Sequence, residues 1–287
     1  MNSLHDVPAP AKLNLFLHIT GRRADGYHLM QSVFMLLDWC DTLHFDARTN
    51  GKLSREDLTT PLPADDLVLQ AARSLQQATG STMGAHISIA KSIPAQAGMG
   101  GGSSDAATTL LALNRLWKLN LSKLQLAQIG LKLGADVPFF IHGSNAWVEG
   151  IGEQITPIDV PTALFLVVKP AAGLSTQAIF TDPSLKLDSP NAIISGFAAY
   201  PFSFGRNDLQ VVAQKLCPDV STALNWLEKQ HLQPRMTGSG SAVFAHVGKD
   251  EIGKFVESKS VESDAPKNAI VKLCSNLAEH PLKNWAN

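Results

Sequence analysis

The chain has 287 residues, and 24 basic against 25 acidic side chains leave a formal net charge of −1. Hydrophobic residues make up 45% of the sequence, too many for a disordered protein, and charged residues make up only 17%, too few for a long coiled coil. The balanced charge argues against a broad basic surface, so we expect no nucleic-acid partner.

The N-terminus, the apolar runs and the cysteines argue against further classes of protein. The first residues lack the basic start and apolar stretch of a secretory signal, and the run at 163–168 is far too short to span a membrane. The three cysteines (Cys40, Cys217, Cys274) are scattered, which fits neither a disulfide framework nor a zinc site. We therefore expect a soluble, cytoplasmic protein without a membrane partner.

The first strong pattern is an alternation at residues 11–19, which predicts a strand with one face in the core. The side chains expected in the core are Leu13, Leu15, Leu17 and Ile19. The opposite face then carries Lys12, Asn14, Phe16 and His18. Further strands are expected at 33–39, 42–46 and 85–91.

Helix start and stop signals are as clear in this half of the chain. The expected helices run from Asp65 or Asp66 to Ala78, over roughly 104–117, and from Ser122 to Gly134. Gly80 provides the stop of the first helix, and Ser122 forms a capping box with Gln125 at the start of the last.

Turn signals cluster at 150–161, which indicates a boundary near residue 155. Strands are expected beyond it at 163–168, at 242–247 and near 268–273. Helices are expected at 175–182, 207–216 and 219–230. Strands and helices interleave in both halves, which indicates an α+β or α/β fold.

The segment 94–105 reads PAQAGMGGGSSD and lies between an expected strand and an expected helix. Its four glycines allow positive φ and a close approach of the backbone to a ligand. The free amides and the positive dipole end of the following helix face the same point, which favours a phosphate site over the alternative, a flexible surface loop. Ser103 and Ser104 add hydroxyls for phosphate oxygens or magnesium, whereas Asp105 repels a phosphate unless it faces away or meets a cation.

Three segments of the chain resemble, in order, the motifs of the GHMP kinases. They are 10–15 (PAKLNL), 94–104 with its glycines and paired serines, and 237–241 (TGSGS). The resemblance implies an α+β fold of two domains, 1–155 and 156–287, with the active site in the cleft between them. It also implies ATP and Mg²⁺ as cofactors, with the metal held mainly by the phosphates and its protein ligands unassigned.

Further segments narrow the resemblance within that superfamily. Residues 10–17, 23–28 (RADGYH) and 134–139 (GADVPF) are similar to kinases that act on a CDP-linked branched alcohol. This similarity implies ATP-dependent phosphorylation of the 2-hydroxyl of 4-diphosphocytidyl-2-C-methyl-D-erythritol, giving the 2-phosphate and ADP, in the non-mevalonate (MEP) route to isoprenoids. Asp66 departs from the Asn that is usual after an acidic residue there, so a side-chain contact near the nucleotide is expected to change.

The same resemblance assigns the catalytic roles to Asp136 and Lys12. Asp136 would orient or deprotonate the attacking hydroxyl, and the ammonium of Lys12 would steady the transferring phosphoryl group. The alternatives are a helix N-cap for Asp136, ahead of Val137 and Pro138, and an ordinary exposed strand residue for Lys12.

The substrate contacts implied by the resemblance come from both halves of the chain. Tyr27 would stack on the cytosine and His28 would hydrogen-bond to it. Phe180 would be the opposing ring, unless it is simply part of the core. Asn14 and Thr176 are further candidates for binding the substrate.

The residues expected at the nucleotide are a lysine and the loop that follows it, namely Lys91, Pro94, Ala95, Gln96, Ala97, Gly98, Met99, Gly100, Gly101, Gly102, Ser103 and Ser104. An exposed edge lysine is the alternative for Lys91. We expect the CDP-linked methylerythritol as the small-molecule partner, and a monomer or weak dimer. Two rival functions remain open: another GHMP kinase of small alcohols, such as homoserine or mevalonate, or a non-catalytic relative that binds a nucleotide or sugar.

Overall fold

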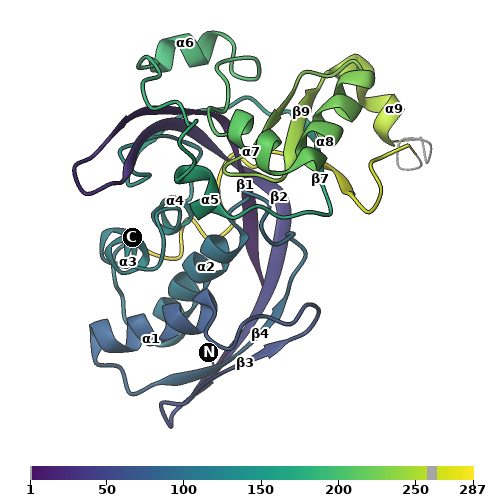
Figure 1. Ribbon diagram of the computed structural model, residues 1–287. Helices are drawn as coiled ribbons and strands as arrows, with labels where there is room; N and C mark the ends of the chain where they lie inside the picture. The colour runs from purple at the N-terminus through teal and green to yellow at the C-terminus, as the bar shows by residue number, and fades with distance from the viewer. Residues whose placement is uncertain (1, 257–263) are drawn as a thin grey trace.

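Two long antiparallel strands, β1 (Ser3–Arg22) and β2 (His28–Arg48), run through the middle of the molecule (Figure 1). The computed structural model describes residues 2–256 and 264–287. The first sheet has six strands in the order β3-β4-β2-β5-β6, with β1 paired to β2. Its shorter strands are β3 (Leu53–Asp57), β4 (Gly84–Ala90), β5 (Ala146–Glu149) and β6 (Gln154–Pro157).

The second sheet is formed by the later part of the chain and has four antiparallel strands in the order β10-β7-β9-β8. Its strands are β7 (Leu164–Lys169), β8 (Pro234–Met236), β9 (Val243–Val247) and β10 (Ile270–Ser275). The strands expected from sequence are therefore confirmed, except that 33–39 and 42–46 are parts of one continuous strand, β2. Two sheets packed with helices confirm the α+β class.

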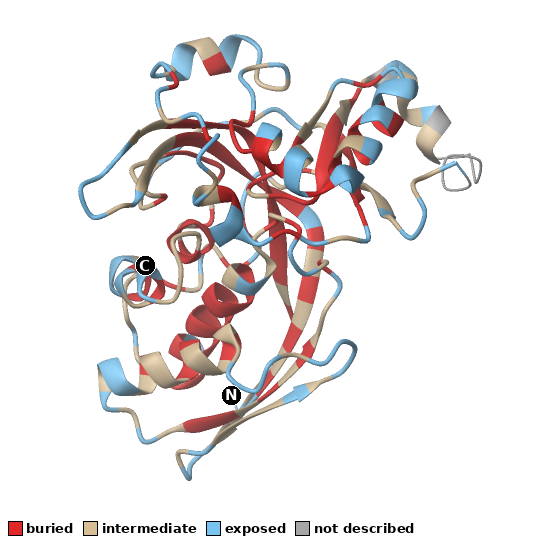
Figure 2. Cartoon of the chain, in the orientation of Figure 1, coloured by how far each residue is buried: buried red, intermediate tan, exposed pale blue. Residues whose placement is uncertain are grey.

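Both faces of β1 are buried, so the prediction of a half-buried strand at 11–19 is wrong. The side chains expected on an open face are all buried: Lys12, Asn14, Phe16 and His18. Helix α2 (Gly101–Leu116) packs against β1, and the second sheet covers another part of it, where Phe16 shares a core cluster with Phe165 and Phe244. Figure 2 shows the central stretch of both long strands as buried. An alternation of period two separates the faces of a strand but does not say what covers each face.

The helices of the first half begin and end close to their predicted signals. α1 (Leu67–Thr79) is capped by Asp66, whose side chain accepts the N–H of Leu69, and it ends at Gly80 with a φ of 67°. The capping box of Ser122 opens α3 (Lys123–Leu131), which stops before the expected Gly134. Two more helices complete this layer: α2, which begins at Gly101 instead of 104, and α4 (Val137–His142).

The helices of the second half confirm the three that were expected and add others. They are α5 (Thr176–Phe180), α6 (Ile194–Ala199), α7 (Gln210–Leu216), α8 (Pro218–Lys229), the 3₁₀ turn η1 (Lys249–Glu251) and α9 (Ile252–Val256). α8 packs on β8 and β9. Among the residues that the structure describes, no helix combines the length and apolarity needed to cross a membrane.

The last residues of the chain leave the second sheet and return to the helices of the first. The N–H of His280 donates to the carbonyl of Gly143 at the end of α4, and the N–H of Lys123 donates to the carbonyl of Asn287. The Arg115 guanidinium lies 4.8 Å from the ring centre of Trp285. The division into 1–155 and 156–287 stays a prediction. The C-terminal segment belongs to the second of these ranges but packs on helices of the first.

His280 makes the docking of this C-terminal segment sensitive to pH. Its ring is buried, Nδ1 accepts the N–H of Leu282, and Nε2 has no partner among the described residues. Burial lowers the pKa of His280 to about 4, from 6.5 in the unfolded chain. Between pH 6.5 and 4, the His280 imidazole is therefore protonated in the unfolded state and neutral in the folded state. The free energy of unfolding falls as the pH falls through this range.

We expect this residue to cost about 2 kcal/mol of stability between about pH 7.5 and about pH 5. Urea denaturation at both pH values would measure the loss in wild type and in His280→Asn, which keeps an acceptor for the Leu282 N–H. The variant should lose less stability than wild type over this range, by roughly that amount. Equal losses in the two proteins would contradict a buried neutral imidazole.

Candidate active site

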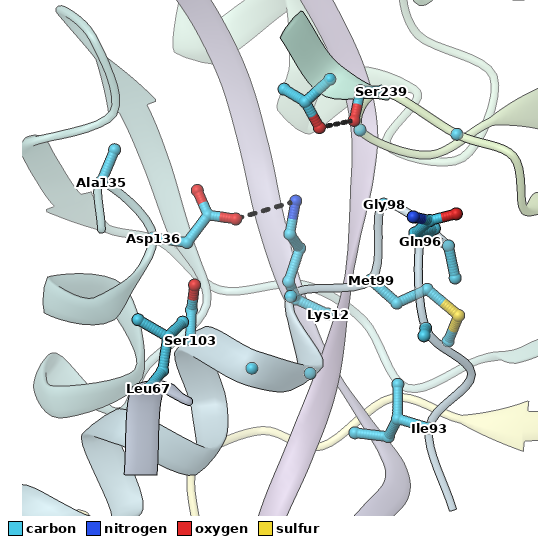
Figure 3. A pocket seen from close by; sticks show the side chains of 18 of the residues that line it. Lys12, Leu67, Ile93, Gln96, Gly98, Met99, Ser103, Ala135, Asp136 and Ser239 are labelled. Carbon is cyan, nitrogen blue, oxygen red and sulfur yellow. Dashed lines mark hydrogen bonds and ion pairs between the residues drawn. The ribbon is translucent and has the colours of Figure 1, made fainter. Parts of the chain in front are cut away.

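A cavity of about 810 Å³ is lined by residues from both halves of the chain. β1 contributes Lys12 and Asn14, and the start of α4 contributes Asp136. The glycine-rich loop forms one wall, and the turn at 238–240 faces it from the second half (Figure 3). The predicted motifs therefore converge on one site.

At its four glycines, the glycine-rich loop meets the cavity with backbone atoms alone. Gly100 has a φ of 72° and precedes the first residue of α2, so the helix starts at Gly101 and its first-turn amides have no partner within the helix. Together with the helix dipole, these amides form an anion site. Residues 94–103 all line the cavity, whereas Ser104 does not: its hydroxyl is buried and has no partner in the described part of the chain.

The second glycine-rich segment, 237–241, holds the first in place. The N–H of Ser241 donates to the carbonyl of Gln96 at 3.2 Å, and a Cβ on Gly98 would lie only 2.3 Å from the carbonyl oxygen of Thr237. The cavity-lining residues of this segment, Gly238, Ser239 and Gly240, were missing from the predicted site. The TGSGS motif at 237–241 was the sequence signal from which these three residues could have been predicted.

Lys12 and Asp136 face each other across the cavity. The Lys12 Nζ lies 3.4 Å from Asp136 Oδ2 and donates to Asn14 Oδ1 at 2.5 Å (Figure 3). It also lies 4.6 Å from the ring centre of Phe34, while the backbone N–H of Lys12 donates to Met99 in the glycine-rich loop. Lys12 is thus buried and aimed at the site, so the alternative of an exposed strand lysine is wrong.

Asp136 occupies the N-cap position of α4, but its side chain makes no capping hydrogen bond. The Asp136 carboxylate is 29% exposed and points to Lys12, so one oxygen meets the ammonium and the carboxylate stays open to the cavity. This geometry favours the catalytic interpretation of Asp136 over the capping one.

Phe180 lines the cavity, and the ring of His28, which does not line it, lies beside the Phe180 ring, with ring centres 5.2 Å apart and planes inclined by 36°. Burial lowers the pKa of His28, and the nearby Arg22 cation lowers it further. Thr176 Oγ1 and Ser239 Oγ lie 2.7 Å apart on the cavity wall. Tyr27 is 60% exposed and does not line the cavity, so the structure places this predicted base contact outside it.

A further wall of the cavity, of which only Asp66 was expected near the nucleotide, depends on Arg55. Its guanidinium is bidentate to Asp57, donates to the carbonyls of Leu62 and Pro63, and lies 2.5 Å from Asp66 Oδ1. These contacts fix the segment that ends in the α1 cap, where Asp66 lines the cavity. No local sequence signal marks Arg55, because Asp57 is its one nearby partner and its contacts with Leu62, Pro63 and Asp66 depend on how the following loop folds back.

Lys91 lines the cavity, but its ammonium is bound between the buried carboxylates of Asp41 and Asp105. The alternative of an exposed edge lysine is therefore wrong. The question left open for Asp105 is answered as well, because it meets a cation. α2 begins earlier than expected, so Asp105 lies beyond the first turn and is buried.

Known proteins resemble this chain over its full length. Residues 66–144 match the GHMP kinases N terminal domain. The 4-diphosphocytidyl-2-C-methyl-D-erythritol kinase of Albidiferax ferrireducens is 64% identical over 286 residues, which cover 100% of this chain and 96% of that protein.

Solved structures agree with this similarity. The crystal structure of a 4-(cytidine 5'-diphospho)-2C-methyl-D-erythritol kinase superposes with a TM-score of 0.77 at 29% identity, covering 93% of this chain and 98% of the other. A mevalonate kinase shares the fold alone, with a TM-score of 0.69 at 14% identity over 94% of this chain and 98% of the other. The full-length identity decides between these relatives, and the chain belongs to the 4-diphosphocytidyl-2-C-methyl-D-erythritol kinase family of the GHMP kinases.

Proposed function

We propose that the chain transfers the γ-phosphoryl group of ATP to the 2-hydroxyl of 4-diphosphocytidyl-2-C-methyl-D-erythritol, giving the 2-phosphate and ADP. The observation that carries this proposal is the Lys12–Asp136 pair facing the glycine-rich loop across one cavity. The relatives named above supply the identity of the acceptor. The reaction belongs to the non-mevalonate (MEP) route to isoprenoids.

ATP binds with its phosphates on the first-turn amides of α2, because phosphoryl transfer requires a fixed, positively polarised cradle. The nucleotide contacts come from the lysine before the loop and from the loop itself: Lys91, Pro94, Ala95, Gln96, Ala97, Gly98, Met99, Gly100, Gly101, Gly102, Ser103 and Ser104. All of these except Ser104 line the cavity, which supports the assignment for the others.

Asp136 accepts or aligns the proton of the attacking 2-hydroxyl, and Lys12 stabilises the charge on the transferring phosphoryl group. The 3.4 Å between Lys12 Nζ and Asp136 Oδ2 lets both groups contact one reacting centre. Asn14 Oδ1 accepts from the same ammonium and fixes its direction. The three side chains thus divide the work: Asp136 handles the proton, Lys12 the charge, and Asn14 the orientation.

The cytidine of the substrate stacks on the Phe180 ring and hydrogen-bonds to His28, with Thr176 near its phosphates and Tyr27 at the rim. Two rings from opposite halves of the chain within 5.2 Å of each other support a base-binding end of the cavity. Tyr27 is exposed, so a stacking role would require it to turn inwards when the substrate binds.

Magnesium fits this site as a companion of the nucleotide. Within residues 2–256 and 264–287, no group of three or more His, Cys, Asp or Glu side chains could hold a metal ion. Mg²⁺ would take most of its ligands from the ATP phosphates and water, and Asp136 and Ser103, which line the cavity, would hold it from the protein side. When bound, it neutralises phosphate charge. We further propose a cytoplasmic enzyme that is a monomer or a weak dimer.

The function is tested by following ADP release from Mg-ATP with each of three alcohols: 4-diphosphocytidyl-2-C-methyl-D-erythritol, homoserine and mevalonate. We expect turnover with the first alone, and phosphorus NMR of the product should find the new ester at the 2-hydroxyl. Turnover with another alcohol would keep the superfamily and overturn the acceptor. Nucleotide binding without ADP release from any of them would indicate a non-catalytic relative.

Asp136→Asn should lower kcat by about 10²–10⁴-fold, because the amide cannot accept the hydroxyl proton. The fold should stay intact, since the carboxylate makes no capping bond, but the melting temperature should fall because the buried Lys12 ammonium loses its carboxylate partner. Single-turnover kinetics and a thermal melt on the same sample would measure both. A near-normal kcat would refute the assigned role.

Phe180→Ala should raise the KM for the CDP-linked substrate about tenfold or more and leave the KM for ATP within about twofold, because base stacking contributes about 1–3 kcal/mol. Tyr27→Ala is the matched comparison at the exposed ring. A large KM effect from Tyr27→Ala would mean that the rim closes over the base. Equal effects of Phe180→Ala on both substrates would argue against the cytidine assignment.

A further inference from the structure

A chain of hydrogen bonds leads from the backbone of β1 to the ammonium of Lys12 and passes through Ser32 of β2. The Ser32 hydroxyl donates to the carbonyl of Phe16, and the side-chain NH2 of Asn14 donates to Ser32 Oγ at 2.9 Å. The other end of the same amide, Asn14 Oδ1, accepts from Lys12 Nζ at 2.5 Å. We call Phe16, Ser32, Asn14 and Lys12 the Ser32 network. Ser32 itself is buried and does not line the cavity.

An irregularity in β1 lies at the point where Ser32 meets Asn14. Asn14 pairs with Phe34 and Leu17 pairs with Ser32, so β1 holds one more residue than β2 over this stretch. The extra residue makes a β-bulge, which takes part of a strand out of the regular ladder and turns its side chains. The carbonyl of Phe16 lies in this bulge, where it accepts the Ser32 hydroxyl. A buried serine on β2 thereby contacts a residue of the site on β1.

The donors and acceptors of the Ser32 network allow one orientation of the Asn14 amide. An ammonium has donors and no acceptor, so the end of the amide that faces Lys12 must be its oxygen. A serine hydroxyl has one proton, and Ser32 uses it on the Phe16 carbonyl, so Ser32 Oγ accepts from the NH2 end of the amide. Both neighbours of Asn14 therefore require the same orientation.

Loss of the Ser32 hydroxyl would leave a buried donor without an acceptor. Asn14 is 1% exposed, so its NH2 group cannot turn to bulk water. The amide would shift to find another partner, and Lys12 Nζ, which lies between Asn14 Oδ1 and Asp136 Oδ2, would lose its fixed direction (Figure 3). Thr237 Oγ1 contacts Asn14 at the oxygen end, at 3.4 Å, so it does not replace Ser32 at the NH2 end.

We propose that Ser32 is a positioning residue for phosphoryl transfer: its hydroxyl fixes the Asn14 amide, and through that amide the ammonium of Lys12. The inference rests on the proposed function, because it takes Lys12 as the group that stabilises the transferring phosphoryl. It goes beyond that function by giving a catalytic consequence to a side chain outside the cavity. The alternative is a purely structural role, in which the hydroxyl only satisfies the Phe16 carbonyl.

The test is a double-mutant cycle on kcat, with Mg-ATP and the CDP-linked alcohol, using Ser32→Ala, Asn14→Ala and the two together. Ser32→Ala should lower kcat about five- to twentyfold and change the KM for ATP by no more than about twofold, because a displaced Lys12 affects the transition state and leaves the nucleotide loop in place. In the Asn14→Ala background, the same change should lower kcat by no more than about twofold, since the side chain through which Ser32 acts is gone.

Ser189→Ala is the matched control, because Ser189 is also buried, lies outside the cavity, and bonds through its hydroxyl to Asp208 and Arg206. It should lower the melting temperature and keep kcat within about twofold of wild type, since none of its partners belongs to the Ser32 network. Equal losses of kcat from Ser32→Ala in the wild-type and Asn14→Ala backgrounds, or no loss in wild type, would overturn the inference and leave a structural role.

A second measurement does not depend on activity. In heteronuclear NMR spectra, the side-chain amide of Asn14 is identified by its loss in Asn14→Ala. Its protons should exchange with water at least about tenfold faster in Ser32→Ala than in wild type, and equal rates would overturn the inference. Absence of wild-type turnover with any alcohol would overturn the proposed function together with it, whereas wild-type turnover that Ser32→Ala retains in full would contradict the inference alone.

Discussion

The site depends on a contact between two stretches of backbone that only glycine permits. A Cβ on Gly98 would lie 2.3 Å from the carbonyl oxygen of Thr237, and one on Gly238 would lie 2.6 Å from the carbonyl oxygen of Gly98. The Thr237 hydroxyl accepts the backbone N–H of Asn14 at 2.9 Å, which adds β1 to the same contact. Because no side chain separates these segments, the loop, the strand that carries Lys12 and the second half of the chain form one rigid wall.

The two buried lysines beside this wall, Lys12 and Lys91, have different roles because their carboxylate partners differ. A buried charge is costly unless it is paired or hydrogen-bonded, and Lys12 and Lys91 are both paired with carboxylates. The carboxylates beside Lys91 are both buried, and its charge is therefore compensated within the protein. The partner of Lys12 is Asp136, which is 29% exposed towards the cavity. Lys12 is thus the ammonium that stays available to a phosphoryl group, although both lysines were expected at the site.

Local signals were predictable from the sequence, and contacts between distant segments were not. The start and the end of α1 follow from single residues, so the cap was narrowed to Asp65 or Asp66 and the end was found at Gly80. The motif around Gly98 located the phosphate site for the same reason. The burial of both faces of β1, by contrast, depends on what packs there from the second half of the chain. The roles of Arg55 and Lys91 depend on ion pairs with Asp66 and Asp105, which the fold brings close. No spacing in the sequence predicts these pairs.

The position of Asp136 at a helix start is a local feature, whereas its pairing with Lys12 is a contact between distant segments. The residues that follow Asp136 explain why its carboxylate makes no capping hydrogen bond. An N-cap side chain usually accepts the N–H of the second or third helical residue. In α4 the second residue is Pro138, which has no N–H, and the N–H of the first, Val137, already donates to the carbonyl of Gly134 at 3.1 Å. Few donors are left to capture the carboxylate. The sequence Asp-Val-Pro therefore places an acidic group at a helix start and removes one of its two usual backbone donors, and the carboxylate faces Lys12 instead.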